Sequence, residues 1–263
     1  MIDKFRQDLH GHLDAVPDGA TVAVGGFGAS GRPDALLNAL CDLGKTELHL
    51  YVNNVGEDFK GVGRLLREGR LRRLTASFPI LPEFYAEYFA GRVEFELVPQ
   101  GTLAERMRAG GAGIAAFYTP SGARTMLSDG EFALSYRDGH PHARVEPKET
   151  RDFDGRPHVL ERGIRADVAL VKGHRGDRKG NIRFRRSARN FNPLAGMCGR
   201  LTFVEVEELV DVDVLDPDDI HLPGVFVDHV VMTAAAVPAT AHIVRTVPGD
   251  HHDTTIPTAE ETR

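Results

Sequence analysis

The chain has 263 residues, of which 41% are hydrophobic and 27% are charged, and its formal net charge is −6. This length suits one large α/β domain or two small ones, and the negative charge argues against a dedicated nucleic-acid-binding protein. No apolar run approaches the roughly 20 residues that span a bilayer, and the first residues, MIDKFRQDLHGHLD, lack the apolar core of a signal peptide. Cys41 and Cys198 have no Cys-x-x-Cys partner. We therefore expect a cytoplasmic protein without a metal or redox site.

Strand-like and helix-like segments alternate through the first half of the chain. The pattern predicts strands at 21–24, 47–52, 72–78 and 93–98, and helices at 33–43, 61–69, 82–91 and 102–110. Repeated β-α-β units imply an α/β fold with a mostly parallel open sheet and helices on both faces. Right-handed crossovers place the loops that follow the strands at one edge of the sheet, where we expect the functional residues.

The second half of the chain has a different pattern. Residues 121–165 contain short strands between charged turns and predict a small β-rich layer, and buried strands follow at 166–173 and 201–210. The sequence becomes polar and rich in Pro and Thr after Val237. We therefore predict one domain over residues 1–237, and a loose or disordered arm over residues 238–263.

A glycine-rich turn follows the first predicted β-α strand. Gly26-Phe27-Gly28-Ala29-Ser30-Gly31 has the G-x-G-x-x-G spacing of a dinucleotide-binding turn. That function also needs an acid at the end of the second strand, to bind the ribose. Here the second strand ends in Asn53-Asn54. The NAD hypothesis is therefore weak, and a tight turn without a ligand is the alternative.

Over a wider window the chain resembles the family I CoA-transferases. The glycine signature of that family is matched by Asp18-Gly19, Val22-Ala23-Val24, Gly25-Gly26-Phe27 and Gly31-Arg32-Pro33. Further matches to the A subunit of 3-oxoacid CoA-transferases, spread over residues 5–230, are VNNVG (52–56), PQGTLAERMRAGGAGIAAFYTPSG (99–122), RADVALVKG (165–173), DRKGN (177–181), ARNFNP (188–193), EVEELV (205–210) and LDPDDIHLPGVFVD (215–228).

The resemblance implies an enzyme that moves CoA between an acyl-CoA, such as succinyl-CoA, and a 3-oxoacid. In that family two related subunits share one active site, and the catalytic glutamate belongs to a Ser-Glu-Asn-Gly motif of the B subunit. This chain lacks the motif, and its Glu205, Glu207 and Glu208 are typical of one face of a strand or helix. The resemblance therefore implies a B-subunit partner in an A2B2 heterotetramer. It also implies a ping-pong reaction with coenzyme A as a substrate, and no metal, nicotinamide or permanently bound cofactor.

The same resemblance places Gln100, Asn53 and Asn54 around the partner's glutamate. Neutral amide donors suit an oxyanion that forms when a carboxylate attacks a thioester. Gly25, Gly26, Gly28 and Gly31 would allow close approach of the substrate, and Phe27 would shape the pocket. Without the resemblance, the residues alone favour Asx turns for the two asparagines and a helix cap for Gln100.

Other features leave alternatives open. Residues 172–189 contain eight Lys or Arg, and this pattern favours a solvated face or a subunit contact over binding of CoA phosphates or RNA. Asp250-His251-His252-Asp253 resembles a metal cluster but lies in the predicted tail. Arg124 stands where relatives usually keep a small residue, and it either binds a substrate carboxylate or is a surface residue. The scaffold is also compatible with a CoA-thioester hydrolase, a ring-opening lyase or a non-catalytic partner subunit.

Overall fold

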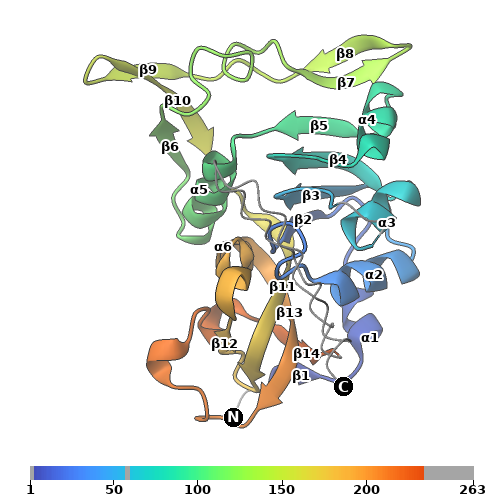
Figure 1. Cartoon of the computed structure of the whole chain (residues 1–263), viewed down its shortest axis with the longest axis vertical. Helices are drawn as coiled ribbons and strands as arrows, with labels where there is room; N and C mark the ends of the chain where they lie inside the picture. Colours follow the sequence, from blue (N-terminus) through green and yellow to red (C-terminus); the bar gives the residue numbers. More distant parts are fainter. Residues whose placement is uncertain (1–2, 57–59, 234–263) are drawn as a thin grey trace, which may run out of the picture.

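A large sheet organises the part of the chain that the computed structural model describes, which is residues 3–56 and 60–233. Its strands lie in the order β1-β14-β13-β11-β2-β3-β4-β5, and β12 pairs with β11 beside this row (Figure 1). Every pairing along the row is parallel, whereas β12 is antiparallel to β11. The strands are β1 (Phe5–Arg6), β2 (Thr21–Val24), β3 (Leu48–Val52), β4 (Leu71–Ala76), β5 (Glu94–Leu97), β11 (Ala166–Asp177), β12 (Ile182–Arg183), β13 (Gly199–Val210) and β14 (His229–Met232). The predicted mostly parallel sheet is confirmed.

Helices connect the parallel strands, and their starts follow from local sequence. The side chain of Asp8 accepts hydrogen bonds from the backbone N–H groups of His10 and Gly11 and so caps the first helix. Pro82 begins a helix because its missing N–H is not needed in a first turn. The helices are α1 (Leu9–Leu13), α2 (Asp34–Asp42), α3 (Val62–Arg67), α4 (Pro82–Phe89), α5 (Gln100–Gly111) and α6 (Asn192–Cys198), with 3₁₀ turns η1 (Arg186–Arg189), η2 (Pro217–Asp219) and η3 (Gly224–Phe226).

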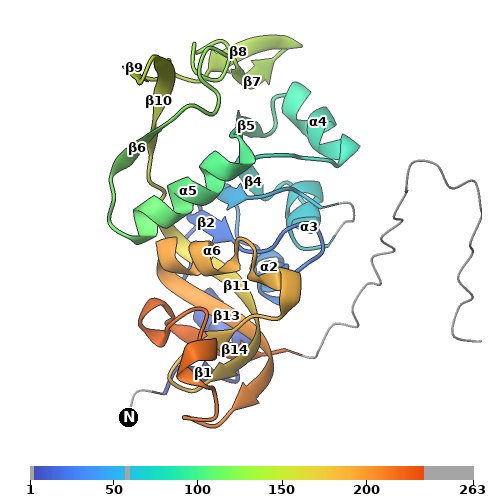
Figure 2. The same ribbon diagram turned by 60° about the vertical axis from the view of Figure 1, so that its left-hand side comes forward.

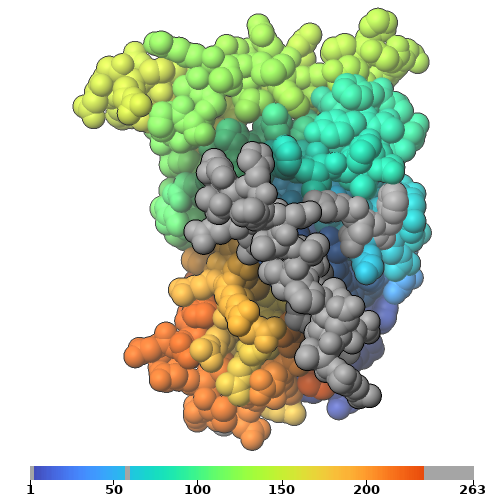
Figure 3. Space-filling view, in the orientation of Figure 1, coloured from blue at the N-terminus to red at the C-terminus, as the bar shows by residue number. Residues whose placement is uncertain are grey.

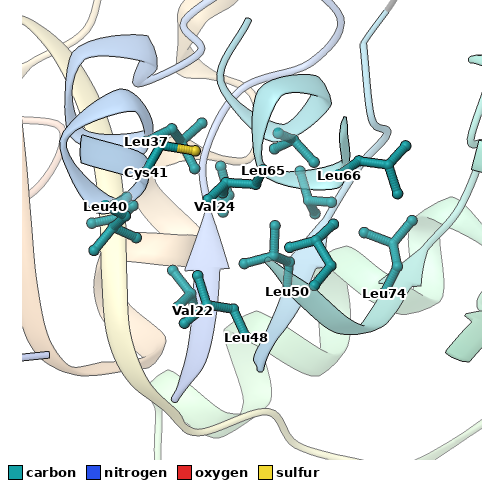
Figure 4. Close-up of a cluster of buried hydrophobic side chains, with 14 of the residues drawn as sticks. Val22, Val24, Leu37, Leu40, Cys41, Leu48, Leu50, Leu65, Leu66 and Leu74 are labelled. Carbon is teal, nitrogen blue, oxygen red and sulfur yellow. The ribbon is translucent and has the colours of Figure 1, made fainter. Parts of the chain in front are cut away.

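The core has two parts, one on each face of the sheet. On one face α1, α2, α3 and α4 pack against the sheet, and Figure 4 shows leucines of α2 and α3 against β2, β3 and β4. On the other face α5 packs on α6, and α6 packs against β11 and β13 (Figures 1 and 2). The predicted arrangement of helices on both faces is therefore confirmed.

The middle of the chain forms two small antiparallel sheets beyond β5, at one end of the molecule (Figures 1 and 2). One contains β6 (Ala116–Thr119), β10 (Arg156–Arg162) and β9 (Thr150–Phe153); the other is the hairpin of β7 (Ala133–Arg137) and β8 (His140–Arg144). Asp138-Gly139 and Asp154-Gly155 form the two hairpin turns, with positive φ at every residue. Asp-Gly suits such turns, so the charged turns seen in the sequence are what separate these strands. The predicted β-rich layer is confirmed.

The end of the chain lies outside the described residues. The predicted arm over residues 238–263 belongs to that part, as do Asp250-His251-His252-Asp253. The predicted boundary at Val237 therefore stays a prediction.

Candidate functional site

The carboxyl ends of four adjacent strands, β2 to β5, form one edge of the sheet. Ala23 of β2 is opposite Tyr51 of β3, and Val52 is opposite Ala76 of β4. Ala76 is in turn opposite Leu97 of β5. The four strands therefore end at one level, and the segments that follow them lie along a single edge. Neighbouring strands are about 4.8 Å apart, so the first and last of these segments are separated by roughly 14 Å.

The glycine turn after β2, residues 25–31, is a tight hairpin. Phe27 and Ser30 exchange two backbone hydrogen bonds, each 3.0 Å long. Gly26 and Gly28 have φ angles of +101° and +56°. These are left-handed conformations that glycine adopts without steric cost. The backbone of the turn therefore depends on its glycines.

Asn192, at the start of α6, holds the glycine turn in place. Its side chain is wholly buried. The Nδ2 group donates to the carbonyl oxygens of Gly31 and Ala188, each at 2.9 Å. The Oδ1 atom accepts from the backbone N–H of Lys172 at 3.0 Å. A Cβ added to Gly25 would overlap this side chain, so the glycine is required by packing within the chain.

The glycines of the turn therefore have two different surroundings. Gly25, Gly26 and Gly31 lie against this chain's own atoms, and a Cβ at Gly26 would come within 3.0 Å of the Gly31 carbonyl oxygen. At Gly28 an added Cβ would meet nothing within 4 Å, and the neighbouring Phe27 is 45% exposed. The tip formed by Phe27 and Gly28 is thus the part of the turn that another molecule can reach.

Asn53 and Asn54 join the loops that follow β3 and β4. Asn53 is only 2% exposed, and its Nδ2 donates to Ser77 Oγ at 3.0 Å. Its backbone carbonyl accepts from the N–H groups of Ser77 and Phe78, each at 3.2 Å. Asn54 donates to Asn53 Oδ1 and accepts from the Gly56 N–H, both at 3.0 Å, which is an Asx turn. Both carboxamides thus make hydrogen bonds within the chain and hold the two loops at this edge together.

Gln100 is the first residue of α5 and is exposed. The N-cap position belongs to Pro99, which makes no side-chain capping hydrogen bond. Within residues 3–56 and 60–233, the Gln100 carboxamide makes no hydrogen bond, so its N–H donors are available. Gln100 and the glycine turn stand at opposite ends of the edge, with Asn53 between them.

Two residues at this edge were not singled out from the sequence. Asn192 lay within ARNFNP, but only the fold brings it against a turn 161 residues away. Phe78 follows β4 and is 64% exposed, while its backbone N–H bonds to Asn53. A large apolar side chain left exposed beside Asn53 suits contact with an apolar part of a ligand. In the sequence, the feature that could have identified Phe78 is Ser77-Phe78-Pro79, which places an aromatic residue directly after a buried strand.

The carboxylate of Glu205 is buried at the start of α2. Glu205 lies on β13 and is 1% exposed; its Oε2 accepts from the Leu36 N–H at 3.0 Å, and its Oε1 is 3.3 Å from Lys172 Nζ. Burial raises the pKa of Glu205 to about 7, although Lys172 and the Leu36 N–H act to lower it. The expected strand-face role is thus confirmed for this residue, since it caps a helix and pairs with a lysine.

Most of the basic residues in 172–189 pair with carboxylates of the same chain. These ion pairs are Lys172–Glu205, Arg175–Glu208, Arg178–Asp3, Lys179–Asp213, Arg183–Asp219 and Arg185–Glu207. Their charges are therefore largely balanced within the chain.

A polar cavity of about 640 Å³ separates β3, β4 and β5 from the β-rich layer. In Figure 3 the molecule is hollowed just below this layer. Glu96 bonds inside the cavity to Arg73 at 2.7 Å and to Arg106 at 2.9 Å. Burial acts to raise the pKa of Glu96, but the two arginines outweigh it and lower the pKa to about 2. Arg106 also donates to the Arg162 carbonyl oxygen of β10 at 3.0 Å and lies 3.8 Å from Glu161 Oε2, so this arginine links the sheet to the layer.

The described part of the chain contains no metal-binding cluster, no accessible thiol and no membrane-spanning helix. No group of three or more His, Cys, Asp or Glu there could hold a metal ion. Cys41 and Cys198 are both buried and unpaired, and burial raises their pKa values to about 11 and about 12. None of the described helices is long and apolar enough to cross a bilayer.

An open parallel sheet thus carries a glycine turn and amide side chains at one edge. Residues 12–233 match the family model described as "Coenzyme A transferase". The chain belongs to the coenzyme A transferase family.

Among its relatives, the chain is similar to the A subunit of the probable succinyl-CoA:3-ketoacid coenzyme A transferase of Mycobacterium tuberculosis. The two are 50% identical over 218 residues, which cover 82% of this chain and 88% of the relative. The human mitochondrial succinyl-CoA:3-ketoacid coenzyme A transferase 2 is 47% identical over 232 residues, covering 87% of this chain and 44% of that protein. The crystal structure of glutaconate coenzyme A-transferase from Acidaminococcus fermentans has a TM-score of 0.74 at 19% identity, over 88% of this chain and 76% of that one, and shows the shared fold.

Proposed function

We propose that this chain is the A subunit of a succinyl-CoA:3-ketoacid coenzyme A transferase, and that it acts with a B subunit. The observation that carries the proposal is the 50% identity to such a subunit over most of both chains. The arrangement of the edge supports it. Gln100 offers an amide donor that makes no hydrogen bond within the described residues. The Glu205 carboxylate, by contrast, is buried and already bonded to Lys172 and to the start of α2. In this proposal the nucleophile therefore comes from the partner.

The proposed reaction begins with attack of a B-subunit glutamate on the thioester carbonyl of succinyl-CoA. The tetrahedral oxyanion collapses, expels the CoA thiolate and leaves a succinyl-glutamyl anhydride. The thiolate then attacks the glutamyl carbonyl, which releases succinate and leaves a glutamyl-CoA thioester. A 3-oxoacid carboxylate repeats these two steps in reverse order and leaves as its CoA thioester. Each step needs only a carboxylate, a thiolate and hydrogen-bond donors.

In this proposal Gln100 donates from its carboxamide to the oxyanion. A neutral donor stabilises the developing charge without pairing with the attacking carboxylate. Asn53 and Asn54 position the loops around the partner's glutamate, since their carboxamides bond within the chain. The glycine turn, held through Gly25, Gly26 and Gly31, lets coenzyme A approach the backbone at Gly28, and Phe27 shapes the pocket. No metal or nicotinamide takes part.

The test is reconstitution of the two subunits. The purified chain alone should not convert succinyl-CoA and acetoacetate, and co-expression with a B subunit that carries Ser-Glu-Asn-Gly should restore turnover. Light scattering on the active complex should give the mass of an A2B2 heterotetramer. We also propose a cytoplasmic location, which agrees with two unpaired thiols. Turnover by the lone chain would contradict the two-subunit site.

A further inference from the structure

The cavity between the sheet and the β-rich layer is large enough to hold a small organic molecule. Its volume is about 640 Å³, and pockets that bind such molecules measure roughly 300–1,000 Å³. Part of its lining is apolar and comes from β5 and the β-rich layer: Leu97, Leu127, Leu134, Val145 and Leu160. The remaining lining is mostly charged or able to form hydrogen bonds. Apolar side chains with a few polar groups among them are typical of a ligand site.

The charged residues that line the cavity, among those the structure describes, carry one excess positive charge. The exposed ones, at its rim, have two charges of each sign: Arg144, Arg162, Glu146 and Glu149. The more buried ones have three positive charges and two negative ones: Arg73, Arg106, Lys148, Glu96 and Glu161. The excess therefore lies inside the cavity. A buried charge without a counter-charge is costly, so the interior favours a bound anion.

Lys148 is the interior cation that has hydrogen-bond donors to spare. Its Nζ group bonds to Glu161 Oε1, which leaves two of the three N–H donors without a partner in the described structure. Arg106, by contrast, already bonds to Glu96 and to the Arg162 carbonyl. The Lys148 side chain is 19% exposed, so an anion bound to it would be poorly screened by water and strongly attracted.

His49 presents an unpaired acceptor to the same cavity. The residue is 7% exposed, and its Nε2 lies 2.8 Å from Thr75 Oγ1, which lies 3.0 Å from Glu96 Oε2. The ionised Glu96 can only accept, so the Thr75 hydroxyl donates to it and His49 Nε2 donates to Thr75. Burial, and after it Arg73, lowers the pKa of His49 to about 3, so the ring is neutral and Nδ1 keeps its lone pair. Within the described residues Nδ1 has no hydrogen-bond partner and is not sealed from solvent, so a ligand in the cavity can reach it.

We infer that this cavity binds a monocarboxylic acid that carries a hydroxyl group on a short apolar chain. Lys148 would hold the carboxylate, the hydroxyl would donate to His49 Nδ1, and the leucines would contact the chain. An amine could also donate to the imidazole, but it would be protonated near neutral pH and would add to the positive excess. A dicarboxylate would exceed the single charge that needs compensation. The inference goes beyond the proposed function and does not depend on it.

The experiment titrates matched probes by calorimetry into the full chain, alone and in the reconstituted complex. The probes are hexanoates with a hydroxyl on the second, third or last carbon, hexanoate without a hydroxyl, and hexanediol without a charge. At least one hydroxyhexanoate should bind with a Kd below about 1 mM. Hexanoate should bind about 3- to 10-fold more weakly and hexanediol about 10- to 100-fold more weakly. These are the effects of losing a neutral and a charge-assisted hydrogen bond.

Two variants assign the binding to the cavity. Lys148→Met should weaken the binding of both kinds of acid about 10- to 100-fold and leave hexanediol unchanged. Lys179→Met is the control, because it removes the same charge from an exposed ion pair outside the cavity. His49→Phe should remove the advantage of hydroxyhexanoate over hexanoate without changing the Kd of hexanoate.

Thermal unfolding shows whether each variant is folded, and the comparison of probes on the wild-type chain needs no variant. Equal affinity for all the probes, or no heat of binding at about 10 mM, would overturn the site. Binding of hydroxyhexanoate that neither Lys148→Met nor His49→Phe alters would overturn it as well, because the ligand would then occupy another part of the molecule.

Discussion

Asn192 Nδ2 donates to the carbonyl oxygen of Gly31 at 2.9 Å, across 161 residues of sequence. Because the asparagine side chain is wholly buried, this bond ties the glycine turn firmly to the start of α6, which packs against β2 and β11. The shape of the turn is therefore decided by two distant parts of the chain rather than by its glycines alone.

Asn192→Ala should loosen the glycine turn and destabilise the protein. The substitution leaves the Gly31 carbonyl and the Lys172 N–H without their present partners, at a cost of about 1–3 kcal/mol in the free energy of unfolding. Urea unfolding measures this cost. Asn190→Ala is the control, because Asn190 also bonds to the turn, at the Ser30 carbonyl, but is only partly buried. An equal effect of the two variants would mean that Asn192 has no special role.

This contact shows what the sequence could predict and what it could not. The alternation of apolar runs and helix patterns predicted the sheet, because the spacing of apolar residues and the identity of turn residues are local properties of the sequence. The glycine spacing predicted a strand-to-helix turn for the same reason. Which side chain fills the space at Gly25 depends on how β11 and α6 pack, and no local pattern carries that information.

The polar face of the sheet gives a second example. Arg73, Thr75 and Glu96 alternate with buried apolar residues in β4 and β5, which is typical of strands with one face in water. The β-rich layer covers that face instead, so Arg73 and Glu96 line a cavity. The layer itself was predicted, but its position over β3 to β5 was not. For the site, the catalytic role of Gln100 and the positioning roles of Asn53 and Asn54 stay predictions; within the described residues both asparagines bond inside the chain.

Glu96→Gln should weaken the ion pairs that connect β4, β5 and α5 beneath the β-rich layer. Arg73 and Arg106 would lose a carboxylate inside the cavity, and the free energy of unfolding near neutral pH should fall by about 1–3 kcal/mol. Glu105→Gln is the control, since its partner Arg108 is exposed and such pairs contribute little.

The pH dependence of the free energy of unfolding distinguishes a loss of the Glu96 ion pairs from a change in packing. Its pKa is lowered from 4.5 to about 2, so the folded state binds fewer protons than the unfolded state between these values. The stabilisation is present above about pH 4.5 and is lost as the pH falls toward about 2. The difference between wild type and Glu96→Gln should therefore shrink in acid. A difference that is constant with pH would contradict the ion-pair explanation.

Glu205 should have the opposite effect on stability. Its pKa is raised from the ordinary 4.5 to about 7, so the folded state holds a proton that the unfolded state has released. Between these values the free energy of unfolding should fall as the pH rises. Glu205→Gln keeps an oxygen for the Leu36 N–H and should remove this decline. Urea unfolding at several pH values tests it, with Glu208→Gln on the same strand as the control. If the free energy of unfolding of Glu205→Gln still falls as the pH rises, other titrating groups cause the decline.

Gln100→Ala tests the proposed oxyanion donor in the reconstituted complex. Loss of one such donor should lower kcat by about 10²–10³. The apparent affinity for acyl-CoA should change much less, because an interaction made only in the transition state is expressed in kcat. The Tm should hardly move, since the side chain is exposed and caps nothing in the described structure. Gln100→Glu keeps the size of the side chain but places a negative charge beside the oxyanion, so its kcat should be lower still. Steady-state kinetics and thermal unfolding on the same samples decide the matter: an unchanged kcat with a lower Tm would make Gln100 a structural residue and remove it from the active site.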